Sequence, residues 1–96
     1  MNAKGATRRI RELVLGPGVF SFEFSKGCRD GMRAHDITAS DVFAVVRTTE
    51  CEMQTNGRWR FEGEDSADRG IRIVVEVDLS VQATFVSIHL STEKGL

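Results

Sequence analysis

Apolar and polar residues follow two different periods along this chain, and the change of period separates predicted helices from predicted strands. Near the N-terminus, Ile10, Leu13 and Val14 recur at helical spacing, which predicts an amphipathic helix over 6–15. Over 19–24, phenylalanine instead occupies every second position, as in a strand that buries one face. The chain is therefore expected to begin with a helix and a strand.

Two further helices are indicated by residues suited to cap their N-termini. Ser25 is placed to cap a helix that ends near residue 35, and Thr38 to cap a helix that ends near residue 47. Asp41 follows Thr38 by three residues, which is the spacing of a capping box.

The second half of the chain returns to the period of strands. Four strands are predicted, over 50–55, 58–65, 71–79 and 83–90. Asn56-Gly57 marks a tight turn between the first two. Because strands cluster at the end without alternating with helices, the order α-β-α-α-β-β-β-β predicts one α+β domain over 1–96. We expect a mostly antiparallel sheet of four or five strands with two or three helices on one face.

Charge is distributed unevenly along the sequence. The whole chain of 96 residues has a net charge of −1, which is weak support for nucleic-acid binding. Residues 1–47 contain eight Lys and Arg against five Asp and Glu, or +3, whereas residues 48–96 contain five against nine, or −4. A local basic surface is therefore expected only in the first half.

Other features of the sequence bear on the location of the protein and on whether it binds a metal or cofactor. No apolar run approaches the roughly 20 residues of a membrane span, and the N-terminus is too polar for a secretory signal, so we expect a cytoplasmic protein. Cys28 and Cys51 form no CxxC motif, and the two histidines are far apart, so no metal and no cofactor are expected. Free buried thiols are favoured over a disulfide.

The predicted helix over 25–35 contains an unusual border of small residues. Gly27, Gly31 and Ala34 fall together along it, although an interior glycine costs about 1 kcal/mol relative to alanine. Two explanations remain open at this point: another backbone packs closely against this border, or a polar site has been lost from it. A small ligand bound along the glycines is a third explanation.

Short motifs recur in a fixed order along nearly the whole chain. They are IRELV (10–14), FEFSK (22–26), Met32, IT (37–38), DV (41–42), NGRWRFEGED (56–65) and VSI (86–88). In order and spacing they resemble a small bacterial domain family of unknown function that is related to RelE-like and BrnT-like ribonuclease toxins. The resemblance implies a compact sheet with helices on one face, and an antitoxin-like protein as partner.

The resemblance also bears on the glycines. The polar helix positions of the family, usually His, Arg and Arg, fall on Gly27, Gly31 and His35, and glycine cannot replace those side chains. We therefore carry no catalytic role over to Gly27 or Gly31. Asp36 stands where the family usually has a helix-ending glycine, and aspartate tolerates the left-handed conformation that such an ending requires.

Cleavage of RNA requires a base, an acid and cations for the phosphate. The remaining catalytic candidates are His35, His89, Arg58 and Arg60, and the binding candidates are Arg33, Trp59 and Arg72. For each there is a structural alternative. Arg58 and Arg60 are expected to pair across the turn with Glu50 and Glu52, the histidines to be ordinary packed or surface residues, and Trp59 to belong to the core or an interface.

Two functions follow from these observations. The first is a partner-binding protein that keeps a toxin-like fold without the toxin's chemistry, favoured by the glycines and the acidic isoelectric point, near 6.1. The second is an active RNA-cleaving toxin that uses His35, His89, Arg58 and Arg60.

Overall fold

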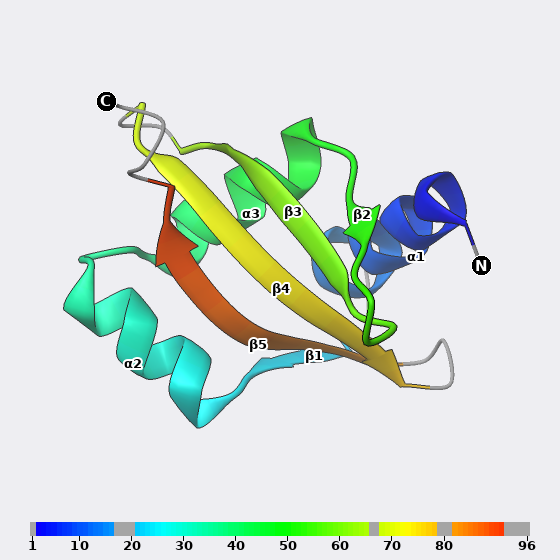
Figure 1. Ribbon diagram of the computed structural model, residues 1–96, viewed down its shortest axis with the longest axis horizontal. Coiled ribbons are helices and arrows are strands. Elements are labelled where there is room, and N and C mark those ends of the chain that lie inside the picture. Colours follow the sequence, from blue (N-terminus) through cyan, green and yellow to red (C-terminus); the bar gives the residue numbers. More distant parts are fainter. Residues whose placement is uncertain (1, 17–20, 66–67, 79–81, 92–96) are drawn as a thin grey trace.

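The chain folds into three helices and one five-stranded sheet, seen in Figure 1. The computed structural model describes residues 2–16, 21–65, 68–78 and 82–91. The elements are α1 (Ala3–Leu15), β1 (Phe22–Phe24), α2 (Lys26–Ala34), α3 (Ala39–Thr48), β2 (Glu52–Met53), β3 (Trp59–Glu64), β4 (Gly70–Asp78) and β5 (Gln82–Leu90). The predicted α+β class and element order are confirmed. Residues 19 and 20, placed in the first predicted strand, lie outside the described residues.

The strands lie in the order β1-β5-β4-β3-β2. From β2 to β5, each strand pairs with the next in antiparallel orientation, so the predicted mostly antiparallel sheet is confirmed. β1 instead joins β5 in parallel, with Phe22 opposite Ala83 and Phe24 opposite Phe85. The N-terminal strand therefore completes the sheet by pairing with the last strand of the chain.

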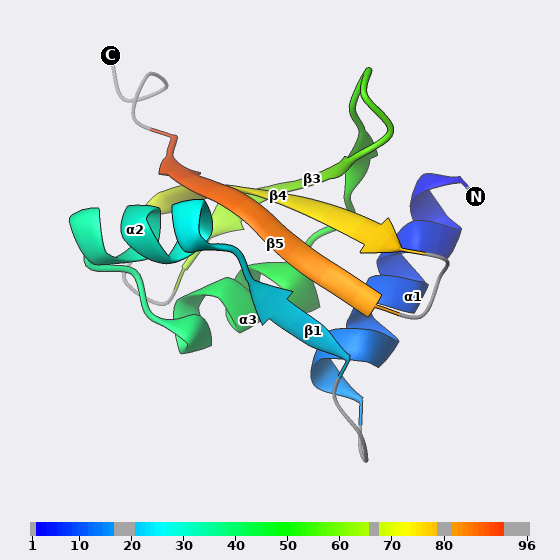
Figure 2. The same ribbon diagram turned by 90° about the horizontal axis from the view of Figure 1, so that it is seen from below.

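The hydrophobic core lies between one face of the sheet and the helices α1 and α3. Figure 2 shows α3 beneath the sheet with α1 beside it, and both helices contact the strands. The strands contribute fully buried Phe61, Ile71, Ile73 and Phe85 to this layer. The opposite face of the sheet is covered by no helix in the described part of the chain, so side chains of alternate residues are presented there to solvent.

The predicted starts of α2 and α3 are confirmed in detail, whereas α1 begins three residues before its predicted start because the Asn2 side chain caps it by accepting from the Gly5 N–H. The side chain of Ser25 accepts a hydrogen bond from the Cys28 backbone N–H at 3.1 Å. Thr38 and Asp41 form the full reciprocal capping box. Between α2 and α3, Asp36 adopts the left-handed conformation, with φ of 55°. These local interactions fix where α2 ends and α3 begins.

Helix α2 lies along the edge of β5, beyond the point where β1 ends (Figures 1 and 2). The Ser25 hydroxyl donates to the Val86 carbonyl at 2.8 Å and anchors the start of the helix there. A methyl group at Gly31 would lie 2.9 Å from the Ile88 carbonyl oxygen, whereas one at Gly27 would lie 3.8 Å from that of Val86. The glycine-lined border of α2 therefore packs against β5. At Gly31 this packing is so close that it leaves no room for a side chain.

The edge strand β2 is shorter than predicted, with two residues instead of six. Cys51 turns into the core, where its backbone N–H donates to the Thr7 hydroxyl at 3.0 Å. Gln54 already belongs to the turn, since its N–H donates to the Arg58 carbonyl. Gly57 in this turn has a φ of +82°, as the Asn-Gly signal implies. No helix in the described residues is long and apolar enough to cross a membrane.

Candidate functional site

The open face of the sheet holds the first group of candidate residues. Glu62 and Arg72 stand opposite each other on β3 and β4, and Arg72 also stands opposite His89 on β5. The Arg72 guanidinium lies 3.6 Å from Glu62, and the Arg60 guanidinium lies 3.9 Å from the other oxygen of the same carboxylate. Glu62 therefore links the two arginines. The structure brings Arg60, Arg72 and His89 to one face, but with a carboxylate among them.

This carboxylate is held in its charged form by its neighbours. The Ser91 hydroxyl donates to Glu62 at 2.9 Å. That hydrogen bond, followed by the two nearby guanidinium groups, lowers the pKa of Glu62 below its ordinary value, against the opposing effect of burial. A hollow of about 220 Å³ opens beside it, lined by Glu50, Glu52, Arg60 and Glu62. With three carboxylates around one arginine, this hollow does not attract a phosphate.

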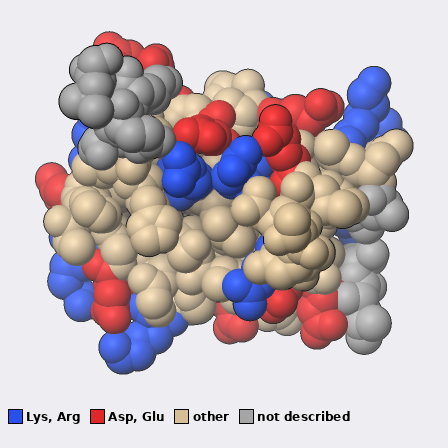
Figure 3. Space-filling model, in the orientation of Figure 1, with Lys and Arg blue, Asp and Glu red and all other residues tan. Residues whose placement is uncertain are grey.

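Arg58 and Arg60 are both in ion pairs, but with carboxylates from different strands. Arg60 pairs with Glu52 at 2.6 Å, which confirms that part of the cross-strand prediction. Arg58 pairs with Glu76 of β4 at 3.5 Å, and not with Glu50 as predicted. The reason is that β3 lies between β2 and β4, so its side chains can reach either neighbour. Figure 3 accordingly shows basic and acidic side chains side by side over this face.

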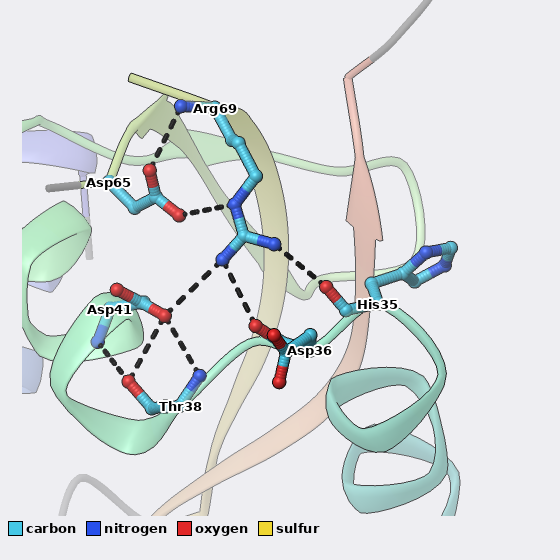
Figure 4. Close-up of polar contacts among 6 residues, drawn as sticks. All are labelled: His35, Asp36, Thr38, Asp41, Asp65 and Arg69. Carbon is cyan, nitrogen blue, oxygen red and sulfur yellow. Dashed lines mark hydrogen bonds and ion pairs between the residues drawn. The ribbon is translucent and has the colours of Figure 1, made fainter. Parts of the chain in front are cut away.

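The candidates on α2 lie on a different part of the molecule. Arg33 is 82% exposed and lies 3.6 Å from Asp30, which Lys26 also contacts at 3.0 Å. Hydrogen bonding and attraction from Lys26, with the neighbouring arginines, lower the pKa of Asp30. His35 follows at the C-cap of the helix, and Figure 4 shows its ring directed away from the nearby polar cluster. This helix presents a solvated basic surface.

Trp59, a candidate for stacking on a base, belongs to the core. Its exposed fraction is 6%, and it starts β3 on the face that points toward the helices. The ring is therefore not presented to a ligand from solution. Of the two interpretations given for Trp59, a residue of the core is therefore the one that the structure shows.

Arg69, which the sequence analysis did not single out, organises a polar cluster between the β3–β4 connection and the α2–α3 turn (Figure 4). Its guanidinium donates to Asp65 at 2.9 Å, to the His35 carbonyl at 2.8 Å and to the Asp36 carbonyl at 3.1 Å. It also lies 3.4 Å from Asp41. The Asp65 side chain is fully buried, so this arrangement supplies the compensation that a buried carboxylate requires. We assign the cluster to stability, because its groups bind one another.

The thiols of the two cysteines lie inside the protein. Cys28 and Cys51 are free and buried. Burial raises the pKa of the Cys28 thiol to about 11 and also raises that of Cys51. Both remain protonated near neutral pH, so neither is poised as a nucleophile. No group of three or more His, Cys, Asp or Glu among the described residues is arranged to hold a metal ion.

A second feature missed from the sequence is a groove along α1. It has a volume of about 480 Å³ and is lined by Lys4, Thr7, Arg8, Arg11, Glu12, Leu15, Gly16 and Glu50. Three of these residues are basic and two are acidic. Part of the signal was present in the sequence, because Lys4, Arg8 and Arg11 recur at helical spacing. The sequence did not show that Glu50, 39 positions after Arg11, lines the other wall of the groove.

Comparison with known proteins identifies no relative. No protein-family model matches the chain, and neither a curated protein nor a solved structure does. Membership of the RelE-like and BrnT-like group therefore stays a prediction, and the function has to be argued from the chain's own residues.

Proposed function

We propose that this chain is a partner-binding protein with a ribonuclease-toxin-like fold that lacks the catalytic chemistry of that class. The observation that carries the proposal is the separation of the candidate catalytic groups. His35 ends α2 with its ring turned away from the polar cluster, while His89 stands on the open face of the sheet. Among the described residues, no histidine lines the hollow along α1, the hollow beside Arg60 and Glu62, or the hollow beside Glu23 and Glu76.

The arginines support the same conclusion. Transition-state stabilisation by a guanidinium requires cations aimed at one phosphate. Arg58 and Arg60 are directed to Glu76 and Glu52, on opposite sides of β3. An incoming phosphate would have to displace these carboxylates before either arginine could contact it. The partner we propose is an antitoxin-like protein in the cytoplasm, in keeping with the resemblance.

Expression of the chain alone in a bacterial host tests this proposal. We expect growth equal to that of a strain that expresses the double variant His35→Ala, His89→Ala at the same level. Growth arrest by the wild-type chain, relieved in the double variant, would support the alternative function of an active RNA-cleaving toxin and overturn the proposal.

A further inference from the structure

We propose that the groove along α1 binds an extended acidic segment of a partner protein. This inference rests on the proposed function, since it locates the surface that the partner occupies. The walls of the groove are α1 and the connection between α3 and β2, which Figure 1 shows next to each other.

The two walls are joined rigidly before any partner arrives. The Arg11 guanidinium donates to the Val46 carbonyl at 2.8 Å and to the Thr49 carbonyl at 2.5 Å, and thereby caps the end of α3. One turn earlier, the buried Thr7 hydroxyl accepts from the Cys51 N–H at 3.0 Å. A preformed groove of this kind loses little entropy when it binds a ligand.

Two of the three cations in the groove are available to a ligand. Lys4 and Arg8 are exposed, and neither forms an ion pair within the described part of the chain. Arg11 contacts neutral carbonyl groups, and no ion pair among the described residues offsets its charge. Glu12 is paired with Arg9 at 3.0 Å, so Glu50 is the lining carboxylate that opposes these cations. The groove has a net positive charge on a chain whose net charge is −1.

The spacing of these cations fits an extended peptide. Lys4 and Arg8 are separated by about 6 Å along the helix axis, at a rise of about 1.5 Å per residue. Alternate side chains of an extended strand are about 6.7 Å apart and point the same way. A peptide with carboxylates at alternate positions can therefore pair with both residues, while Leu15 offers it an apolar contact at one end of the groove.

A nucleic acid fits the groove less well. No aromatic side chain is found among the described residues that line it, so a base would have nothing to stack on. Glu50 would also repel a continuous phosphate backbone, whereas a peptide can place a neutral residue next to it. Charge complementarity therefore favours an acidic protein segment over RNA.

The test measures the binding of a fluorescein-labelled synthetic peptide with glutamate at alternate positions, by fluorescence anisotropy at low salt. A peptide with glutamine at those positions and a single-stranded RNA of the same length serve as comparisons. We expect the glutamate peptide to bind most tightly and to be released by added salt. Charge reversal by Lys4→Glu with Arg8→Glu should weaken its binding about tenfold or more.

The matched control reverses two cations of the same spacing outside the groove, Arg29→Glu with Arg33→Glu on α2. Compared at about 0.15 M salt, this variant should bind the peptide within about twofold of the wild type, because a Debye length of about 8 Å limits exposed charges to short-range effects. Equal weakening in both double variants, tighter binding of the RNA, or self-association abolished by the Lys4 and Arg8 changes would each overturn the inference. Growth arrest, by contrast, would overturn the proposed function and leave the peptide result unchanged.

Discussion

Two glycines on the same helix should respond in opposite ways to the same substitution. Gly27 and Gly31 both lie in α2 and are one turn apart, so alanine at either improves helix propensity. The gain is about 1 kcal/mol at an interior position and about half of that for Gly27, which lies in the first turn. Any larger difference between the two variants must come from what the new methyl group meets.

The surroundings of the two positions differ sharply. At Gly27 the methyl carbon would lie 3.8 Å from the nearest oxygen, an ordinary contact. At Gly31 it would lie 2.9 Å from the Ile88 carbonyl oxygen and 3.0 Å from the Ile88 side chain. The carbonyl belongs to β5, which is held in place by its pairing with β4, so relief requires the helix to move away from the sheet. Overpacking of this kind costs about 1–3 kcal/mol.

Urea unfolding of both variants, followed by circular dichroism, measures the result. We expect Gly27→Ala to raise the free energy of unfolding by about 0.5 kcal/mol. Gly31→Ala should lower it by up to about 2 kcal/mol, which is the overpacking cost less the gain in propensity. If Gly31→Ala is as stabilising as Gly27→Ala, α2 does not pack on β5 as described, and the structural explanation of Gly31 is refuted.

Three further predictions concern Arg69, Cys28 and Glu62. Arg69→Met should lower the free energy of unfolding by about 2–3 kcal/mol, because it leaves the Asp65 carboxylate buried without its main partner. A loss below about 0.5 kcal/mol, which is the effect of an ordinary surface substitution, would contradict the assignment of this cluster to stability. Cys28 in the native protein should resist iodoacetamide at pH 8 and react at once in urea, because its pKa is about 11 and it is buried, as mass spectrometry can show; rapid native labelling would be inconsistent with this burial. Ser91→Ala should raise the pKa of Glu62, measured by NMR titration, since it removes the largest cause of the lowering; an unchanged pKa would exclude that hydrogen bond. Because the native pKa of Glu62 is lowered, its contribution to stability is present at neutral pH and is lost as the pH falls through that pKa, and the variant should show a smaller loss.

The parts of the fold that depend on neighbouring residues could be predicted from sequence. Ser25 and Thr38 cap their helices because each side chain reaches a backbone group three residues away, and the Asn56-Gly57 turn is equally local. The left-handed conformation of Asp36 was expected instead from the resemblance, because aspartate tolerates this conformation and stands where a helix-ending glycine is usual. Short-range chemistry of this kind is visible in the order of residues alone.

Contacts between distant segments were not visible in the same way. The parallel pairing of β1 with β5 joins residues 61 positions apart, such as Phe22 and Ala83, and nothing in either segment specifies the other. The Arg58 ion pair was assigned to the wrong strand because a side chain on an inner strand has neighbours on both sides. Arg69 was missed because, apart from nearby Asp65, its closest partners lie in the α2–α3 turn, 33 and 34 positions earlier in the chain.

The measurement that tests the account most directly is cleavage of RNA by the purified chain. The wild-type protein and the double variant His35→Ala, His89→Ala would be incubated with a labelled RNA, free and in the presence of ribosomes, and the products separated on a denaturing gel. The account predicts that the RNA remains intact with both proteins. Cleavage by the wild type that disappears in the variant would contradict the central claim that this fold serves binding and carries no catalytic site.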